Sequence, residues 1–254
     1  MNLPTKSYGK SRTPNEAFSR EKINSNWLFP QSIEEMKSIQ KQMAQQVIQE
    51  DTFNSPEWIG GMDVSHNVRD PAQMIYAAAI ILHYPSLKQI EQSCHSEQQK
   101  FPYIPGFLGF REAPALVNAF KNLQRKPDLL MIDGHGICHP RGLGIASHLG
   151  VLLDIPTIGV AKSILVGLPA ASLQPEVGSQ VPLVWNGKTL GILYRSKKRA
   201  HPLVISVGHK ISLPSAVTWA SRCLQGYRLP EPTRQAHLAA NSCRKQFHNN
   251  GKLP

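Results

Sequence analysis

Five residues of this chain have the types needed for metal-assisted hydrolysis of a phosphodiester bond: Asp63, Glu112, Asp133, Lys162 and His237. If the three carboxylates converge, a hard cation must neutralise them, and Mg²⁺ prefers oxygen ligands, retained waters and phosphate oxygens. Such a site can activate water and stabilise the leaving oxygen. Lys162 could offset charge on the phosphate, and His237 could orient or deprotonate the attacking water. Spacing alone does not show that these residues meet.

Two of the five residues follow apolar runs that are typical of buried strands. Leu129–Ile132 predicts a strand that ends at Asp133, and Thr157–Ala161 predicts a second strand that ends before Lys162. The apolar segment 143–153 between them predicts a helix. This strand–loop–helix–strand unit indicates a parallel α/β arrangement, in which ligands bind outside the carboxyl ends of the strands. We therefore expect Asp133 and Lys162 to lie near one another.

Asp63 and Glu112 are open to structural interpretations as well as functional ones. Asp63 is a lone carboxylate in the predicted strand 58–65, and it is costly to bury without a metal or a hydrogen-bonding partner. Both interpretations remain open for Asp63. Glu112 lies in the first turn of a helix predicted over 110–123, where a negative charge suits the helix dipole.

The other predicted elements surround this central unit. A capping box at Ser32–Glu35 begins a helix to about Ile48. Later elements are an Asn186-Gly187 hairpin and a final helix that begins near Pro230 and continues into a frayed basic tail. Short links predict that three strands form an antiparallel meander, and the remaining elements are a strand and a helix: 58–65, 74–83 and 87–96 for the meander, 203–207 for the strand, and 212–224 for the helix.

The loop Phe101–Phe107 is aromatic and constrained by two prolines. One interpretation is a loop that fills the core. The other is a rigid wedge that inserts between bases or stacks on them. Composition alone slightly favours the first interpretation.

Composition limits the partners of this 254-residue chain. With 28 Lys plus Arg against 17 Asp plus Glu, its formal charge is +11, which favours nucleic acid first and an anionic membrane surface second. No apolar run approaches the roughly 20 residues that span a bilayer, and no secretory signal begins the chain. The cysteines have no Cys-x-x-Cys spacing, which argues against a zinc site and predicts four reduced thiols in a cytoplasmic protein.

Residues 1–26 are polar and basic and predict a disordered arm. Residues 27–243 predict one catalytic domain, and residues 244–254 a basic tail. We expect a monomer.

Six stretches within residues 32–240 resemble the endonuclease V family of deoxyinosine-directed repair nucleases. The resemblance implies an α/β, RNase H-like fold, with a mixed central sheet of antiparallel meander and parallel strands flanked by helices. The stretches are Gly61–Ser65, Pro102–Glu112, Asp133–Arg141, Gly144–His148, Pro156–Ser163 and Leu229–Arg234.

The resemblance also implies a role for each matching position. The metal-site residues would be Asp63, Glu112 and Asp133, and the supporting catalytic residues Lys162 and His237. The wedge that fills the gap of an extruded base would be Tyr103 with Pro102, Ile104 and Pro105. The lesion pocket, which reads hypoxanthine through main-chain groups, would comprise Gly106, Leu108, Gly134 and Ile145.

The family resemblance implies Mg²⁺-dependent cleavage of the second phosphodiester bond 3′ to deoxyinosine, with Mn²⁺ as a substitute ion. The products would carry 3′-hydroxyl and 5′-phosphate ends. Two alternatives remain open: an inosine-specific endoribonuclease of the same fold, and a non-catalytic module that binds nucleic acid through its charge. The second alternative predicts salt-sensitive binding without cleavage.

Overall fold

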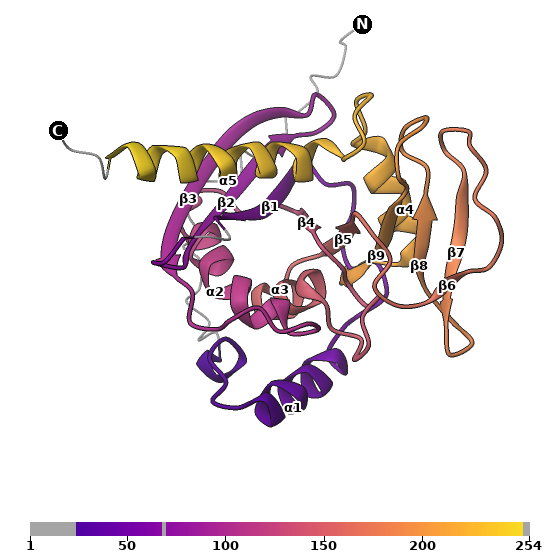
Figure 1. Cartoon of the computed structure of the whole chain (residues 1–254). Helices are drawn as coiled ribbons and strands as arrows, with labels where there is room; N and C mark the ends of the chain where they lie inside the picture. Colours follow the sequence, from indigo (N-terminus) through magenta and orange to yellow (C-terminus); the bar gives the residue numbers. More distant parts are fainter. Residues whose placement is uncertain (1–23, 68–69, 251–254) are drawn as a thin grey trace, which may run out of the picture.

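A nine-stranded mixed sheet separates two layers of helices (Figure 1). The computed structural model describes residues 24–67 and 70–250, and the sheet is that of the described residues. The predicted arm over residues 1–26 lies outside the described residues up to residue 23. Residues 25–27 form a single 3-10 turn.

In chain order the elements are η1 (Ser25–Trp27), α1 (Ile33–Ala44), β1 (Trp58–His66), β2 (Met74–His83), β3 (Lys88–Gln98), α2 (Leu108–Lys121), β4 (Leu129–Asp133), α3 (Ile145–Leu153), β5 (Thr157–Ala161), β6 (Leu168–Pro169), β7 (Gln180–Trp185), β8 (Lys188–Tyr194), β9 (Leu203–His209), α4 (Leu213–Arg222) and α5 (Glu231–Asn250).

The sheet has the strand order β3-β2-β1-β4-β5-β9-β8-β7-β6. Strands β1, β2 and β3 form the predicted antiparallel meander, because each link between them is short. Strand β4 pairs in parallel with both β1 and β5. The sequence prediction of a mixed sheet with a meander and parallel strands flanked by helices is therefore confirmed.

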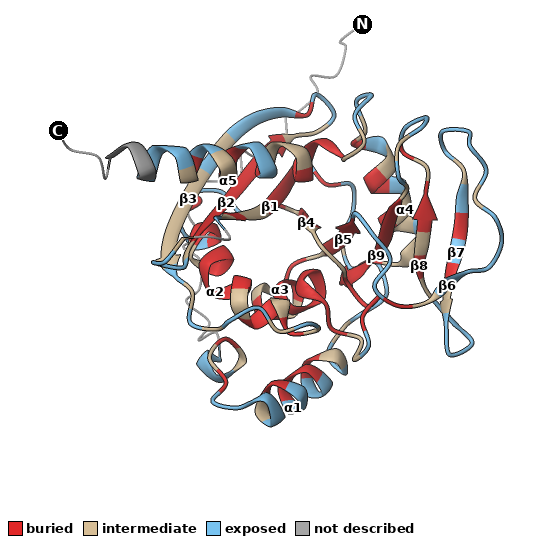
Figure 2. Cartoon of the chain, in the orientation of Figure 1, coloured by how far each residue is buried: buried red, intermediate tan, exposed pale blue. Residues whose placement is uncertain are grey.

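Alternation along the strands divides the core into two parts, one on each face of the sheet. In β2, the side chains of Ala77, Ala79 and Ile81 pack against the layer of α1, α2 and α3. The intervening Ala78 and Ile80 pack against the layer of α4 and α5. This period of two is the side-chain repeat of a strand, and β2 is buried along nearly its whole length (Figure 2).

Several helix boundaries differ from the sequence predictions, including the start of α3 at Ile145 rather than 143, and tertiary contacts account for the differences in α1 and α5. Helix α1 ends at Ala44 rather than Ile48, since the backbone of Ile48 bonds to the segment that follows β9. Helix α2 begins at Leu108, two residues before the predicted start, so Glu112 lies beyond its first turn and the helix-dipole explanation for this residue is wrong.

A further difference is at the carboxyl end, where α5 continues to Asn250. The prediction of a frayed tail is therefore wrong for residues 244–250. The Arg244 guanidinium donates to the His66 carbonyl, and the Phe247 ring lies 5.7 Å from that of Tyr76. These contacts with the first two strands extend the helix past the point where its sequence becomes polar.

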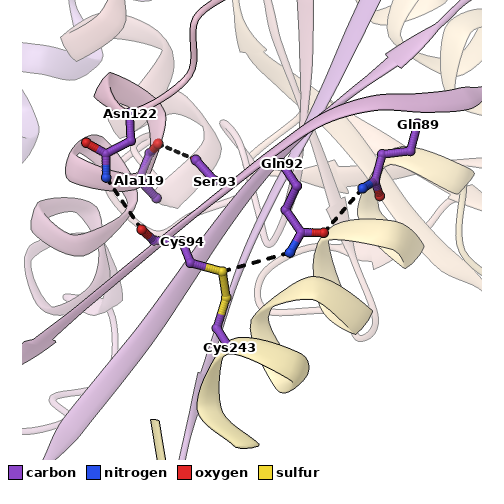
Figure 3. Close-up of a disulfide and its surroundings, with 7 residues drawn as sticks. All are labelled: Gln89, Gln92, Ser93, Cys94, Ala119, Asn122 and Cys243. Atoms are coloured by element: carbon purple, nitrogen blue, oxygen red, sulfur yellow. Dashed lines mark hydrogen bonds between the residues drawn. A yellow bond between two sulfur atoms is a disulfide. The ribbon is translucent and has the colours of Figure 1, made fainter. Parts of the chain in front are cut away.

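A disulfide joins Cys94 of β3 to Cys243 of α5 (Figure 3). The two Cα atoms lie 6.3 Å apart, within the range that a disulfide spans. The prediction of four reduced thiols is wrong for this pair, which is 149 residues apart in sequence and meets only because α5 crosses the meander. Cys138 and Cys223 are free and buried.

Among the described residues, no helix combines the length and the apolar character that crossing a membrane requires.

Candidate functional site

The charged residues predicted for catalysis continue the apolar side-chain rows that face α5. In β1, Ile59 is followed at a spacing of two by Gly61 and then Asp63 on the same face. The same alternation places Asp133 after Leu129 and Met131 in β4. It places Lys162 after Ile158 and Val160 at the end of β5. Three adjacent parallel strands thus carry three polar side chains to one edge of the molecule, as expected for ligand sites in such sheets.

Asp63, Asp133 and His237 form a group that could hold a metal ion. One ligand atom from each lies within 4.8 Å of the others. Nδ1 of His237 is 2.8 Å from Oδ2 of Asp63. The Lys162 ammonium donates to Oδ2 of Asp133. The structure therefore brings together four of the five predicted catalytic residues, from β1, β4, α5 and the end of β5.

Close packing of α5 on β1 sets the position of His237. A Cβ on Gly61 would lie 2.0 Å from the Pro232 carbonyl oxygen in the first turn of α5, so only glycine allows this approach. Glu231 at the start of the helix is buried and accepts two hydrogen bonds of 2.7 Å from the Arg234 guanidinium. These contacts hold the helix start, and His237 follows within two turns.

Electrostatics at the group favour a cation. Burial and the neighbouring Asp63 charge raise the pKa of Asp133, and Lys162 opposes that rise. The hydrogen bond to Asp63 raises the pKa of His237, against a smaller effect of burial. A buried carboxyl whose ionised form is disfavoured by a neighbouring carboxylate, as at Asp133, would be stabilised by a bound cation.

Glu112 lies on the opposite face of the sheet, in α2, and is outside the three-residue group. Burial raises its pKa to about 8, and the charges of Asp63 and Asp133 add to that rise. The side chain is therefore close enough to feel both carboxylates. In the absence of a cation it is held in the protonated form at neutral pH.

The proline-constrained loop shows both of the properties weighed from its sequence, at different residues. Phe107 is buried and packs in the core beside Phe110. Tyr103 is 61% exposed. Pro102 and Pro105 are exposed, and Ile104 is half-buried against the core. The loop is thus anchored at its end and presents one aromatic ring to solvent.

Of the four predicted lesion-pocket positions, Leu108 and Ile145 are the first residues of α2 and α3, Gly106 lies just before α2, and Gly134 directly follows β4. A Cβ on Gly134 would lie 2.4 Å from Cγ2 of Ile145, so these two positions are in contact. Gly106 and Leu108 lie on the segment that leads into α2, and α2 packs against α3. Three of the positions therefore belong to the helix layer opposite α5, and Gly134 contacts that layer from the end of β4.

Three side chains bond to the Gly106 carbonyl, and the sequence analysis assigned none of them a role. Gln40 of α1 donates at 2.9 Å, His139 lies at 3.1 Å, and Arg141 donates at 2.6 Å. Gly106 has φ +80°, a conformation that glycine adopts most readily. His139 and Arg141 belong to a stretch that carries the resemblance, but no local signal marks Gln40, whose distance in sequence from Gly106 is 66 residues.

Comparison with known sequences gives the family of this chain. A family model described as Endonuclease V matches residues 41–238. The Endonuclease V of Protochlamydia amoebophila is 55% identical over 227 residues, covering 89% of this chain and 97% of that protein.

Solved structures agree with the sequence comparison. Endonuclease V of Streptomyces avermitilis has a TM-score of 0.81 and 32% identity, covering 88% of this chain and 97% of that chain. Endonuclease V of Ciona intestinalis, in complex with a 24mer DNA containing an inosine followed by a ribo-adenosine, has a TM-score of 0.74 and 27% identity, covering 85% and 98%. The fold is the predicted RNase H-like fold, and the chain belongs to the Endonuclease V family.

Proposed function

We propose that this chain is a metal-dependent DNA repair endonuclease that recognises deoxyinosine. It hydrolyses the second phosphodiester bond 3′ to the lesion and leaves 3′-hydroxyl and 5′-phosphate ends. The observation that carries this proposal is the convergence within 4.8 Å of Asp63 in β1, Asp133 at the end of β4 and His237 in α5. The family membership and the inosine-containing DNA bound by the Ciona relative support it.

The residues of the group divide the work by their chemistry. Asp63 and Asp133 would hold Mg²⁺, or Mn²⁺ in its place, with Glu112 joining once the ion offsets the cost of its buried charge. The bound ion supplies an activated water and stabilises the leaving oxygen. Lys162 pairs with Asp133 in the metal-free protein and would offset charge on the scissile phosphate. His237 orients the attacking water from the Asp63 side.

Lesion reading belongs to the opposite helix layer. A base must leave the stack before its Watson–Crick edge can be read, and Tyr103, whose ring is exposed, would be the wedge that fills the gap. Main-chain groups at Gly106, Leu108, Gly134 and Ile145 would read the extruded base. Hypoxanthine has a carbonyl where adenine has an amine, so backbone N–H and C=O groups can discriminate the two bases. Recognition and cleavage are then displaced from each other, as a nick beyond the lesion requires.

The test is cleavage of a labelled duplex with one deoxyinosine, in Mg²⁺ and in chelator. We expect a Mg²⁺-dependent nick one nucleotide beyond the phosphate 3′ to the lesion. Asp133→Asn should slow the nick by about a thousandfold, the scale of about 4 kcal/mol of charge stabilisation. Glu176→Gln, at an exposed loop carboxylate, is the matched control and should cleave normally.

Three outcomes would contradict parts of the proposal. Normal cleavage by Asp133→Asn would overturn the site. Faster cleavage of a matched inosine-containing RNA would mean that RNA is the substrate. Contacts with the 2′-hydroxyl are what let a protein distinguish RNA from DNA. Salt-sensitive binding without cleavage of the DNA or the RNA would indicate a non-catalytic binding module.

A further inference from the structure

Two pairs of hydrogen-bonded side chains connect β1 to α5. Asp63 pairs with His237, and Ser65 pairs with Asn241. Two residues along a strand advance about 6.8 Å, and four residues along a helix advance about 6 Å. The distance between the two β1 residues therefore matches the distance between the two α5 residues, so both pairs can form on the facing surfaces of the strand and the helix.

Asn241 of the second pair also bonds to His237 of the first pair. Oγ of the buried Ser65 lies 2.8 Å from Oδ1 of Asn241, and Nδ2 of Asn241 lies 3.0 Å from Nε2 of His237. An amide oxygen accepts hydrogen bonds and an amide nitrogen donates them. The Ser65 hydroxyl therefore donates to Oδ1, which directs the amide N–H groups toward His237.

This direction determines where the proton of a neutral His237 ring lies. Nε2 accepts from Asn241, so it carries no proton, and the ring N–H is at Nδ1. Nδ1–H then donates to Oδ2 of Asp63 at 2.8 Å. The other carboxylate oxygen, Oδ1, accepts from the Val64 backbone N–H at 2.8 Å. The donor order Ser65, Asn241, His237 thus ends on a carboxylate that is held at both oxygens.

We propose that Asn241, oriented by Ser65, is a positioning residue that, together with Asp63, fixes the ring tautomer and orientation of His237 beside the metal-binding carboxylates. This inference rests on the proposed function and deepens it. Because the Nε2 lone pair is already engaged by Asn241, His237 acts through Nδ1 and Asp63. It therefore orients groups at the metal site and does not serve as a base through Nε2.

The test distinguishes the effect of the Asn241 N–H donor from the effect of the side chain's size. Asn241→Asp keeps the size of the side chain but accepts hydrogen bonds at both oxygens, so it requires a proton on Nε2 of His237. Asn241→Ala removes the group and favours the helix intrinsically, so α5 should still form. Ser65→Ala removes only the orienting hydroxyl. Ser242→Ala, at an exposed position next to Asn241 on the same helix, is the matched control.

The first readout needs neither metal nor substrate. Long-range ¹H–¹⁵N spectra of histidine-labelled, metal-free protein, recorded at a pH where the ring is neutral, report its tautomer. The wild type and Ser242→Ala should show the proton on Nδ1 of His237. Asn241→Asp places an acceptor at each ring nitrogen, so Nε2 should gain a proton while Nδ1 keeps its own, and Asn241→Ala should retain the Nδ1 proton because Asp63 still accepts it.

The second readout is cleavage of the deoxyinosine duplex. Loss of a residue that orients a metal-site group lowers activity or metal affinity by about tenfold to a hundredfold. We expect kcat to fall on that scale in Asn241→Asp and Asn241→Ala, less in Ser65→Ala, and KM to stay unchanged.

An Nε2–H tautomer in the wild type, or wild-type kcat in Asn241→Asp, would overturn the inference. The spectra remain decisive about the tautomer even if no nucleic acid is cleaved, so failure of the proposed function and failure of this inference give different results.

Discussion

The two helix layers hold their titratable groups in opposite ways. In the layer of α1, α2 and α3, burial keeps such groups neutral: the pKa of Glu112 rises to about 8, and those of His139 and His148 fall to about 4. In the layer of α5 and the strand ends, the groups are paired. His237 bonds to Asp63 there, and Glu231 bonds to Arg234.

This difference follows from what each layer is proposed to do. Discriminating a flipped base through main-chain groups needs a rigid, apolar surround in which few charges compete for hydrogen bonds. Placing a cation and a phosphate needs several charges at the edge of the protein, each balanced by a partner. The sheet separates the two environments. Glu112 is the exception, because its buried carboxyl lies in the neutral layer yet feels the charges of Asp63 and Asp133.

The largest expected effect is on folding stability, when Glu112 is replaced by glutamine. Because one pKa unit corresponds to about 1.4 kcal/mol, raising the pKa of Glu112 from 4.5 to about 8 amounts to about 5 kcal/mol. Below pH 4.5 the carboxyl is protonated in both states and costs nothing. As the pH rises toward 8, only the unfolded chain loses the proton, so stability falls. Metal-free Glu112→Gln should therefore be more stable than the wild type by several kcal/mol at pH 8.5 and equal to it at pH 4, in urea unfolding.

Glu231→Gln is the control from the other layer. Burial alone would raise the pKa of Glu231, but the hydrogen bonds from Arg234 and Gln235 lower it overall. Its ionised form is the stabilising one, so this variant should be less stable than the wild type at pH 8.5, with the difference lost as the pH falls through the folded-state pKa. If both substitutions changed stability with the same sign at pH 8.5, the contrast between the layers would be wrong.

The second effect concerns the covalent tether of the α5 layer. Cys94 and Cys243 close a chain segment of 149 residues, and loss of a native disulfide typically costs about 2–5 kcal/mol. The double variant Cys94→Ser/Cys243→Ser should unfold at a correspondingly lower urea concentration. Reductant should lower the stability of the wild type toward that of the variant and leave the variant unchanged. A wild type that is insensitive to reductant, after the free thiols have been counted, would contradict the tether.

The third effect is on binding and not on stability. Tyr103 is 61% exposed, so Tyr103→Ala should leave the unfolding free energy nearly unchanged. If its ring replaces an extruded base, its loss should weaken binding to a deoxyinosine duplex by about 2 kcal/mol, or roughly thirtyfold. Trp185→Ala, at an exposed aromatic residue on β7, is the control. An equal loss of affinity in both variants would show that Tyr103 has no special place in lesion binding.

Sequence patterns predicted best what depends on local periodicity. The apolar runs before Asp133 and Lys162 are strands, and their carboxyl ends do meet, because adjacent parallel strands end at the same edge. Patterns failed where a distant contact decides. Helix α5 extends past Arg244 through contacts with β1, β2 and β3, and the disulfide partners are 149 residues apart.

The site shows the same division between local pattern and distant contact. The polar identity of Asp63 was visible as an anomaly in a strand, but its hydrogen bond to His237 joins residues 174 positions apart. Gln40 had no signal, because an amide on an amphipathic helix is ordinary until the fold places it against the Gly106 carbonyl. Loop composition left a wedge open as one interpretation; its assignment to Tyr103 and the pocket roles came from the family resemblance and stay predictions.

The smallest expected effect tests whether the neutral layer reads the lesion through its backbone. Gly106 and Gly178 both have positive φ, +80° and +93°, so alanine at either position should cost about 1 kcal/mol of stability. A Cβ on Gly178 meets nothing within 4 Å, whereas one on Gly106 would lie 2.8 Å from the Arg141 guanidinium that bonds to its own carbonyl.

Gly106→Ala should therefore lose at least as much stability as Gly178→Ala, and only Gly106→Ala should narrow the preference for deoxyinosine over adenosine duplexes, measured as the ratio of kcat/KM values. A stability loss shared by both variants cancels in this comparison, so the remaining difference reports the displaced carbonyl. Unchanged selectivity in Gly106→Ala would mean that the contacts of Gln40, His139 and Arg141 stabilise the loop without shaping recognition. The proposal that one helix layer recognises the lesion while the other holds the cleavage site would then depend on Tyr103 alone.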